Sequence, residues 1–564
     1  MTIEGIMKRD LFSGKGVRLI PLGGLGEIGM NIGLLETQED LLVIDAGLMF
    51  PEEEMLGIDI VIPDFSYIFQ NREKVRAIII THGHEDHTGS LPFLLREISV
   101  PVYGTPLTLG LVGEKLREFG LQEKADLRQI SPRETIEIGS LRLEFIRVSH
   151  SIPDGVAVAI HTPAGIVLHA GDFKFDQTPV DGELTDYHKL AELGDQGVLV
   201  LLSDSTNALK SGFTPSEKEV GVTFEEILRR TKNRVIVACF ASNIHRIQQV
   251  MDVAARLGRK VAVNGKSMLA NVRIASDLGY LRVPEGILVR LDELKGLPPE
   301  KGVIITTGSQ GEPLSAIARM AIGEHKQIHI QKGDTVVFSA RVIPGNEKSI
   351  ARAINQLIRK GADVITEEVA GVHVSGHPSQ EELKLMLNLV RPKFFVPIHG
   401  EYRHLHFHAQ LAQEVMVPKE NVFLLENGSV LELTPTSGKV IGQIPAGRVF
   451  VDGKGIGDVG DTVLRDRQHL AQDGMVIIVL GIDKQKGEVI AGPEIVSRGF
   501  VYGETSEFLF EKAKGLILEV LQGLSIEEKR DWSMVKHRIR AVLKRFLYKA
   551  VERRPMVLPV IIEI

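Results

Sequence analysis

The residues best suited to chemistry in this chain lie in the heptapeptide THGHEDH at 81–87. His82, His84, Asp86 and His87 directly follow residues 75–80, an apolar run with the length of a buried strand. Histidine and carboxylate suit a hard-to-borderline divalent metal. His82 and His84 can point one way and Asp86 and His87 another, which suits two metals that clamp an in-line displacement. A polar surface loop is the alternative, and it explains so dense a set of ligands poorly.

The composition is that of an ordinary soluble protein with several domains. The chain has 564 residues, 43% of them hydrophobic and 25% charged, which allows roughly three or four domains. Its single cysteine, Cys239, excludes an internal disulfide framework, and its apolar neighbours indicate a buried side chain and not a nucleophile. Cysteine usage therefore fits a reducing cytoplasm.

Neither a targeting segment nor a membrane span is indicated. Residues 1–15 lack the apolar segment of a secretory signal, and no run of eighteen apolar residues occurs. We therefore expect a cytoplasmic protein with no membrane partner. The net charge of −7 argues against an indiscriminate polyanion coat, but a local basic channel or bound metals could still hold a phosphate backbone.

A glycine-rich stretch, GLGEIG at 24–29, matches a dinucleotide-binding pattern without its context. That motif requires a helix after the glycines, whereas residues 31–37 and 41–45 have the pattern of two strands in a hairpin. We expect instead that the glycines let a loop pass close to the metal site.

Further polar residues stand at the ends of apolar runs: His150, Asp172, Asp204 and His399. Each would lie at the edge of a sheet, where sites are built, although a lone histidine there is more often structural. Between residues 235 and 360, strand and helix patterns alternate. This alternation predicts a parallel sheet covered by helices, a Rossmann-like domain inserted after the first block.

The H-x-H-x-D-H pattern at 82–87 resembles the signature of the metallo-β-lactamase superfamily. The chain from Asp204 onward resembles its β-CASP branch, with Asp204, His377 and His399 at the three motifs of that branch. A histidine at the last of these motifs is typical of enzymes that act on RNA. The chain is similar to the bacterial ribonuclease J family over almost its whole length, as in the stretches 240–246, 306–313, 373–377 and 495–500.

The fold implied by this resemblance is α/β. It is a metallo-β-lactamase αββα sandwich with an inserted Rossmann-like β-CASP domain and a small α+β C-terminal domain. The expected parts are the metallo-β-lactamase domain at 1–210 and 371–432, the β-CASP domain at 211–370, a linker at 433–454 and the C-terminal domain at 455–564.

The resemblance implies two catalytic metals, zinc or manganese, whose ligands lie in two sets with Asp172 between them. The two sets are His82, His84 and His150, and Asp86, His87 and His399. Asp45 would support the ligand loop from behind, or it is a simple turn cap.

The reaction implied is hydrolysis of a phosphodiester to products with a 5′-phosphate. Water activated by the metals would attack in line. Asp86 would orient that water, His377 would protonate the leaving oxygen, and Asp204 would position that side of the site.

We also expect a pocket for a 5′-monophosphate, which would make the enzyme a 5′-to-3′ exonuclease. Its residues would be Ser242, Asn243, Ile244, His373, Val374, Ser375, Gly376 and His377. A glycine turn can direct backbone N–H groups at an anion, and the start of a helix adds donors. A tight turn that merely aims His377 is the alternative.

The resemblance further implies a structural calcium at Gly57, Asp59 and Asp452, for which ordinary surface aspartates are the simpler explanation. The expected partners are RNA, further copies of the chain in a homodimer or homotetramer formed through the C-terminal domain, and other RNA-decay proteins. The last predicted helix, 534–551, has one apolar face and many basic residues. It is a core helix with a solvated face, an RNA-guiding surface or a subunit interface.

The predicted function is therefore a metal-dependent ribonuclease of RNA maturation and decay, an exonuclease with endonuclease activity also open. One alternative is a small-molecule hydrolase of thioesters or β-lactams, against which the inserted domain and His377 count. The other is an RNA-binding regulator with an idle site, against which the complete ligand set counts. The RNA targets, the native metal and the oligomeric state stay open.

Overall fold

The computed structural model describes residues 16–310, 315–343, 346–453, 455–483, 488–501 and 505–563. It divides into two compact units. The first comprises Met1–Phe50 and Ile60–Val449, and the second comprises Pro51–Asp59 and Phe450–Ile564. The stretch 306–313, on which part of the family resemblance rests, is described only as far as residue 310.

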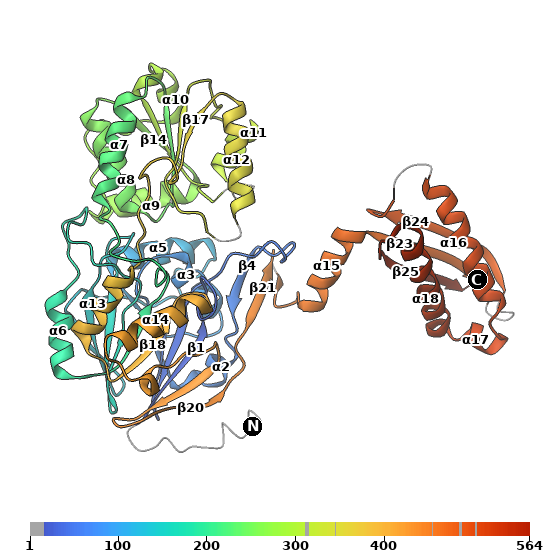
Figure 1. The fold of residues 1–564 in the computed structure, drawn as a ribbon, viewed down its shortest axis with the longest axis horizontal. Helices are drawn as coiled ribbons and strands as arrows, with labels where there is room; N and C mark the ends of the chain where they lie inside the picture. Colours follow the sequence, from blue (N-terminus) through green and yellow to red (C-terminus); the bar gives the residue numbers. More distant parts are fainter. Residues whose placement is uncertain are drawn as a thin grey trace. The chain divides into compact units, whose positions relative to one another are not determined.

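Two β-sheets form the sandwich of the first unit (Figure 1). The larger has the order β20-β19-β1-β2-β3-β5-β6-β7, with β1 (Val17–Gly23), β2 (Ile32–Glu36), β3 (Leu41–Ile44), β5 (Val75–Ile79), β6 (Val102–Gly104), β7 (Leu127–Gln129), β19 (Ser429–Leu433) and β20 (Gly438–Gln443). The smaller has the order β18-β12-β11-β10-β9-β8, with β8 (Thr135–Ile138), β9 (Leu141–Arg147), β10 (Val156–Thr162), β11 (Gly165–His169), β12 (Val198–Asp204) and β18 (Phe394–Ile398).

Alternation of side chains along the strands produces the layers of the sandwich. In β9, Leu143 and Phe145 belong to the core between the sheets, whereas Ile146 belongs to the core under the helices. Helices α6 (Tyr187–Gln196), α13 (Gln380–Val390) and α14 (Tyr402–Glu414) cover that outer face. Helix α5 (Pro106–Glu118) lies against β6 and β7 of the other sheet. The αββα arrangement expected from the sequence is confirmed.

The inserted domain leaves the sandwich after β12, and the chain rejoins the sandwich before α13 and β18. Strands β12 and β18 are parallel neighbours. Its five-stranded sheet is entirely parallel in the order β14-β15-β13-β16-β17, with β13 (Val235–Ala238), β14 (Lys260–Asn264), β15 (Gly302–Thr306), β16 (Thr335–Phe338) and β17 (Asp363–Ile365). The predicted Rossmann-like sheet is confirmed.

Helices cover both faces of this sheet, as Figure 1 shows. One face is covered by α7 (Lys218–Arg230), α8 (Ile244–Arg256) and α9 (Lys266–Asp277), the other by α10 (Leu291–Lys295), α11 (Ala316–Ile322) and α12 (Glu347–Arg359). The chain passes from β13 to neighbours on one side and later to β16 on the other. The C-terminal ends of β13 and β16 therefore border a topological switch point, where open α/β sheets bind ligands.

The second unit is a small α+β fold. Its sheet has the order β24-β23-β25, with β23 (Met475–Ile482), β24 (Val489–Arg498) and β25 (Met556–Glu563). The helices are α15 (Asp461–Asp473), α16 (Thr505–Gln522), α17 (Ile526–Arg530) and α18 (Trp532–Val551). Ile478 and Leu480 pack under α16 and α18, whereas Val496, Leu558 and Ile562 are 42%, 42% and 50% exposed. An apolar part of this sheet is thus open.

The structure differs from the sequence prediction over the linker at 433–454. Residues Gly438–Gln443 form β20, which pairs with β19 in the sandwich. The strand is a sheet edge and none of its residues is fully buried, so its sequence lacks the apolar pattern of a core strand.

Candidate active site

The ends of several strands meet at one edge of the sandwich and bring the predicted metal ligands together. His82 and His84 lie in the turn after β5, and the short helix α3 (Glu85–Thr88) carries Asp86 and His87. Two of the groups that converge there are His82, His84 and His150, and Asp86, His87, Asp172 and His399, and two further groups include His377. Each residue offers one ligand atom within 4.8 Å of those of its group. The grouping is the one expected from the sequence.

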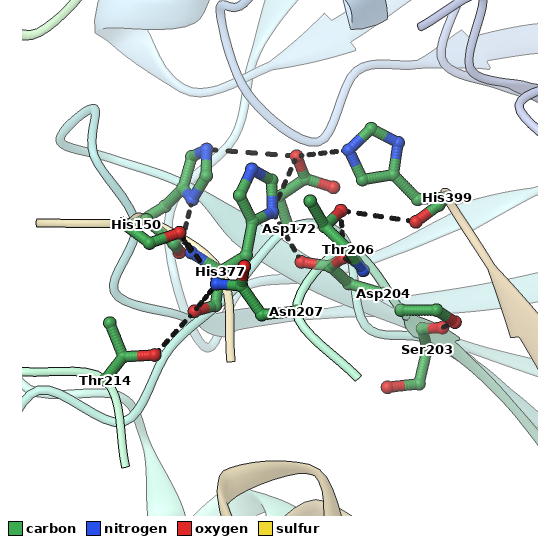
Figure 2. Close-up of polar contacts among 12 residues, drawn as sticks. His150, Asp172, Ser203, Asp204, Thr206, Asn207, Thr214, His377 and His399 are labelled. Carbon is green, nitrogen blue, oxygen red and sulfur yellow. Dashed lines mark hydrogen bonds and ion pairs between the residues drawn. The ribbon is translucent and has the colours of Figure 1, made fainter. Parts of the chain in front are cut away.

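Asp172 lies between the two groups. Its Oδ2 is 3.3 Å from His87 Nε2 and 3.4 Å from His399 Nε2, and 3.8 Å from the Nε2 atoms of both His82 and His150. Figure 2 shows the Asp172 carboxylate facing His150, His377 and His399. A carboxylate at this position can bridge two cations.

The imidazoles are oriented as metal ligands are. His87, His150 and His399 each donate from Nδ1, to Asp45 Oδ2 at 2.8 Å, to the Gly376 carbonyl at 2.7 Å and to Asn31 Oδ1 at 2.7 Å. Because Nδ1 carries the proton, the lone pair of each Nε2 points into the cluster. A metal-bound histidine normally donates its other N–H in this way, so the residues present fit a pair of divalent ions.

Burial and neighbouring charges shift the pKa values in opposite directions within the cluster. Burial lowers the pKa of His84 to about 4 and the pKa values of His82 and His150 well below the ordinary value, which keeps these rings neutral and able to bind a metal. At His87, burial acts the same way, but the carboxylates of Asp172, Asp86 and Asp45 outweigh it and raise the pKa. The same negative field favours a bound cation.

Asp45 lies directly behind the ligands and is 1% exposed. Besides His87, its carboxylate accepts the Thr81 backbone N–H at 2.8 Å and the Thr81 hydroxyl at 2.9 Å. Its φ of +60° is unusual for a residue other than glycine, and His399 also has a positive φ, +54°. Backbone of this kind is typical of functional sites whose surroundings hold it in place.

Asn31 is a site residue that sequence reasoning missed. Its amide nitrogen donates to Asp86 Oδ2 at 3.2 Å while its oxygen accepts from His399, so it joins two ligands that are far apart in the chain. The glycine-rich loop brings it there, since Gly26 N donates to the Gly400 carbonyl at 2.9 Å. The loop does pass close to the site, but no sequence pattern distinguished Asn31 from its neighbours.

His377 and Asp204 form a pair beside the metal ligands (Figure 2). His377 Nδ1 donates to Asp204 Oδ2 at 2.7 Å and is 3.8 Å from Asp172 Oδ2. Burial opposes protonation, but the charge and hydrogen bond of Asp204 raise the pKa of His377 to about 9. The His377 carbonyl accepts from Asn207 Nδ2 at 3.0 Å and from the Thr214 hydroxyl at 2.8 Å. Asn207 and Thr214 carried no signal in the sequence.

Only some of the residues predicted for a phosphate pocket have side chains that are available to a ligand. Ile244 and Val374 are 0% and 7% exposed and belong to the core of the inserted domain, so only their backbones can face a ligand. Asn243 caps α8 by accepting the Arg246 N–H at 3.0 Å, and Ser242 precedes it in the turn between β13 and α8. Ser375 accepts from Asn207 Nδ2 at 2.8 Å. His373 and Val374 line an open pocket together with Pro215 and residues of α7.

Gly376 also supports a metal ligand, a role that the sequence did not predict. Its carbonyl accepts a hydrogen bond from His150 Nδ1 at 2.7 Å. A Cβ added at Gly376 would lie 2.7 Å from the His150 ring, so only glycine allows this approach.

Cations gather around His373. Its Nδ1 is buried and has no hydrogen-bond partner among the described residues. Burial, and then the charges of Arg246, Lys210, Arg341 and Lys174, lower the pKa of His373. Burial and the charge of Arg341 also lower the pKa of Lys210. Arg341 Nη1 donates to Asn207 Oδ1 at 3.2 Å, and neither Lys210 nor Arg341 has an ion pair in the described part of the chain. An anion would relieve this concentration of positive charge.

The residues predicted to hold calcium all lie in the second unit. Asp59 Oδ2 accepts the Gly453 N–H at 2.8 Å, whereas Asp452 pairs with Arg467 Nη2 at 2.6 Å. A Cβ added at Gly57 would lie 2.7 Å from Arg467 Nη1. A guanidinium therefore contacts one of the expected ligands, and the calcium site stays a prediction.

Two further features that the sequence analysis considered are the single cysteine and the presence of a membrane span. Cys239 is buried, and burial raises its pKa to about 12, so it is not a nucleophile. Within the described residues, no helix has the length and apolar character needed to cross a membrane.

Four family models match successive parts of the chain. They are the metallo-beta-lactamase superfamily at residues 25–211, the ribonuclease J beta-CASP domain at 232–357, the Zn-dependent metallo-hydrolase RNA specificity domain at 361–424 and the ribonuclease J C-terminal domain at 462–564.

Curated relatives are similar over nearly the whole chain. Ribonuclease J2 of Bacillus subtilis is 46% identical over 97% of this chain and 99% of its own length. Ribonuclease J of Thermus thermophilus is 45% identical over 97% of this chain and 95% of its own. Among solved structures, a protein of unknown function from Enterococcus faecalis matches 74% of this chain and 100% of its own at a TM-score of 0.53 and 14% identity, which is a likeness of fold alone.

Proposed function

The chain belongs to the ribonuclease J family of metal-dependent ribonucleases, and on that premise we propose that it is a 5′-to-3′ exonuclease selective for RNA with a 5′-monophosphate. The observation that carries the proposal is that the metal-ligand groups and a cluster of cations around His373 lie at the two ends of the segment 373–377; Lys210 and Arg341 in this cluster have no ion pair within the described residues. The first can cut a phosphodiester and the second can hold the end of the chain that is cut.

The metal centre in this proposal holds two divalent ions. One lies with His82, His84 and His150, the other with Asp86, His87 and His399, and Asp172 faces both. The ligands are imidazole and carboxylate without a thiolate, which suits zinc or manganese. When bound, such ions make water nucleophilic near neutral pH and offset charge on a phosphodiester.

Two side chains of the protein handle protons. Asp86 is the more exposed carboxylate of the centre, at 32%, so its oxygens can reach and orient an incoming water. His377 donates from Nδ1 to Asp204, and its pKa of about 9 keeps the ring protonated near neutral pH, so Nε2 also carries a proton for the leaving 3′-oxygen. Asp204 is fully buried and fixes the orientation of the His377 ring.

The terminal phosphate lies, in this proposal, at the switch point of the inserted sheet. Ser242 and Asn243 stand at the start of α8, a helix of 13 residues whose N-terminus favours an anion. His373 and Ser375 add side-chain donors from the opposite segment, and Lys210 and Arg341 add positive charge nearby. His377 shares the short segment of His373 and Ser375, so the phosphate is held close to the metals.

We extend the proposal to the organisation of the protein. The metallo-β-lactamase domain would comprise 1–210 and 371–432, the β-CASP domain 211–370 and the assembly domain the residues from 455. The open apolar part of the sheet, with Val496, Leu558 and Ile562, supports self-association into a dimer or tetramer. A cytoplasmic enzyme with RNA as its substrate, and with other RNA-decay proteins as further partners, is consistent with these features.

The test compares RNAs of one sequence with 5′-monophosphate, 5′-hydroxyl and 5′-triphosphate ends. The wild type should prefer the monophosphate and release mononucleotides. A His373→Ala, Ser375→Ala variant should lose the preference by roughly 10- to 150-fold for each of the two hydrogen bonds removed, because a hydrogen bond to a charged group contributes about 1.5–3 kcal/mol. Equal rates on all three ends in the wild type would refute the proposal.

A matched control removes the same side-chain types from exposed positions. His188→Ala, Ser437→Ala changes one exposed histidine and one exposed serine that are not among the proposed site residues, and it should keep the wild-type preference. Turnover of a thioester or a β-lactam with no cleavage of RNA would instead favour the small-molecule hydrolase.

A further inference from the structure

Four charged side chains lie buried in a row between the inserted domain and the sandwich. They are Arg246, Glu217, Asp176 and Lys174, which are 0%, 3%, 2% and 2% exposed. Charged groups are rarely buried to this extent, and a buried pair is weak evidence for stability because desolvation offsets the attraction. The row therefore calls for a reason other than stability.

The backbone of Arg246 supports one side of the proposed phosphate pocket, the side formed by Ser242 and Asn243. It is the third residue of α8, and its N–H is bonded to the side chain of Asn243 at 3.0 Å. Ser242 and Asn243, which are proposed to face the phosphate, are thus tied to the same turn.

The side chain of Arg246 supports the other side of the pocket, the side formed by His373 and Ser375. Its Nη1 donates to the Val372 carbonyl at 3.0 Å and to Ser339 Oγ at 2.5 Å, and the Ser339 hydroxyl in turn donates to the same Val372 carbonyl at 2.7 Å. Val372 directly precedes His373. The remaining N–H groups of the guanidinium bind both oxygens of Glu217, at 2.7 and 3.1 Å.

The other end of the row reaches the metal ligands. The Glu217 N–H donates to Asp176 Oδ2 at 3.0 Å, and Asp176 pairs with Lys174 Nζ at 3.3 Å. The Lys174 N–H donates to the Ser149 carbonyl at 2.7 Å. Ser149 directly precedes His150, and Lys174 is two residues beyond Asp172. The row thus connects the backbone beside His373 to the backbone beside two ligands.

We infer that Arg246 is a positioning residue that sets the distance between the 5′-phosphate pocket and the metal centre. The inference rests on the proposed function. A planar guanidinium held by a bidentate carboxylate and by three oxygens of Ser339 and Val372 has little freedom, so the two sides of the pocket move together. A fixed distance allows only one phosphodiester to reach the metals, and this determines both the end selectivity and the single-nucleotide step.

The test uses Arg246→Lys, which keeps the charge and removes the planar fork. Rates are measured on 5′-monophosphate and 5′-hydroxyl RNA, and the products are sized. The ratio of the two rates should fall by about 10- to 100-fold, the effect of a misplacement of about 1 Å. Dinucleotides should appear beside mononucleotides, a change that mere loss of stability would not cause.

The matched control is Arg234→Lys. Arg234 pairs with the buried Asp334 at 2.5 Å at the N-terminal ends of β13 and β16, opposite to the end that carries the proposed pocket. Arg234→Lys should therefore keep the wild-type ratio and product size. Ser339→Ala provides a milder variant in case Arg246→Lys does not fold, because it removes one contact of the guanidinium and one of the Val372 carbonyl. It should shift the ratio and the product size in the same direction.

The possible outcomes distinguish a failure of the proposed function from a failure of the proposed role of Arg246. A wild type without monophosphate preference would overturn the proposed function, and the inference with it. A wild type with that preference, together with folded Arg246→Lys and Ser339→Ala variants that keep the ratio and release only mononucleotides, would overturn the inference alone. A change in Arg234→Lys equal to that in Arg246→Lys would also overturn it.

Discussion

Replacement of Asp45 by asparagine should weaken the metal centre without touching a ligand. The carboxylate accepts from Thr81 with one oxygen and from Thr81 and His87 with the other. Asparagine has a single acceptor oxygen and an NH₂ group, so either the Thr81 N–H or the His87 Nδ1–H is left facing a donor. Asparagine tolerates the φ of +60° at this position, so the backbone should be preserved.

The magnitude follows from the lost contact. A hydrogen bond to a buried charged group contributes about 1.5–3 kcal/mol, and loss of a group that orients a metal ligand typically lowers metal affinity about 10- to 100-fold. The second range corresponds to about 1.4–2.7 kcal/mol, in agreement with the first. We expect the metal that His87 binds to be the one affected.

The assay is competition between the protein and a chelator, with bound metal counted by mass spectrometry. Asp40→Asn is the control, because Asp40 is also a buried carboxylate, accepts the Ser140 N–H at 2.7 Å and pairs with Arg76 at 2.6 Å, but stands at the opposite end of β3. It should lower the free energy of unfolding and leave metal affinity unchanged. Equal metal affinity in Asp45→Asn and the wild type would refute the reasoning.

Other changes separate chemistry from assembly. Asp86→Ala or His84→Ala should abolish RNA cleavage while the midpoint of thermal unfolding of the metal-free protein stays close to that of the wild type; near-normal cleavage by metal-replete Asp86→Ala would contradict the ligand assignment. Truncation at about residue 450 removes most of the second unit but none of the proposed metal ligands. It should therefore reduce self-association, measured by light scattering, and slow the cleavage of long RNA without abolishing the chemistry. A truncated protein with the same subunit number and activity would contradict the proposed role of the second unit.

The sequence predicted those parts of the protein that local pattern encodes. The apolar run before His82 and the one before His399 mark strand ends, so these ligands can be predicted without knowing which distant residues they contact. The alternating pattern of the inserted domain gave its parallel sheet for the same reason.

What the sequence could not reveal depends on contacts between distant residues. Arg246 has the pattern of a surface residue of an amphipathic helix, yet it is fully buried because Glu217 and Val372 meet it from elsewhere in the chain. Ile244 and Val374 fall within a predicted pocket, but their side chains pack into the core of the inserted domain. Strand β20 was missed because an edge strand needs only a partner and not an apolar face.

The long separation between the ligands has a consequence for the newly made protein. Asn31 and His399, which touch in the finished site, are 368 residues apart, and β18 must pair with β12 before His399 can reach its place. At a synthesis rate of about 5–20 residues per second, roughly 20 to 70 s pass between the appearance of the two residues. During that time the ribosome carries a chain with an incomplete ligand set. The order of the strands thus delays completion of the ligand set until most of the chain has been made.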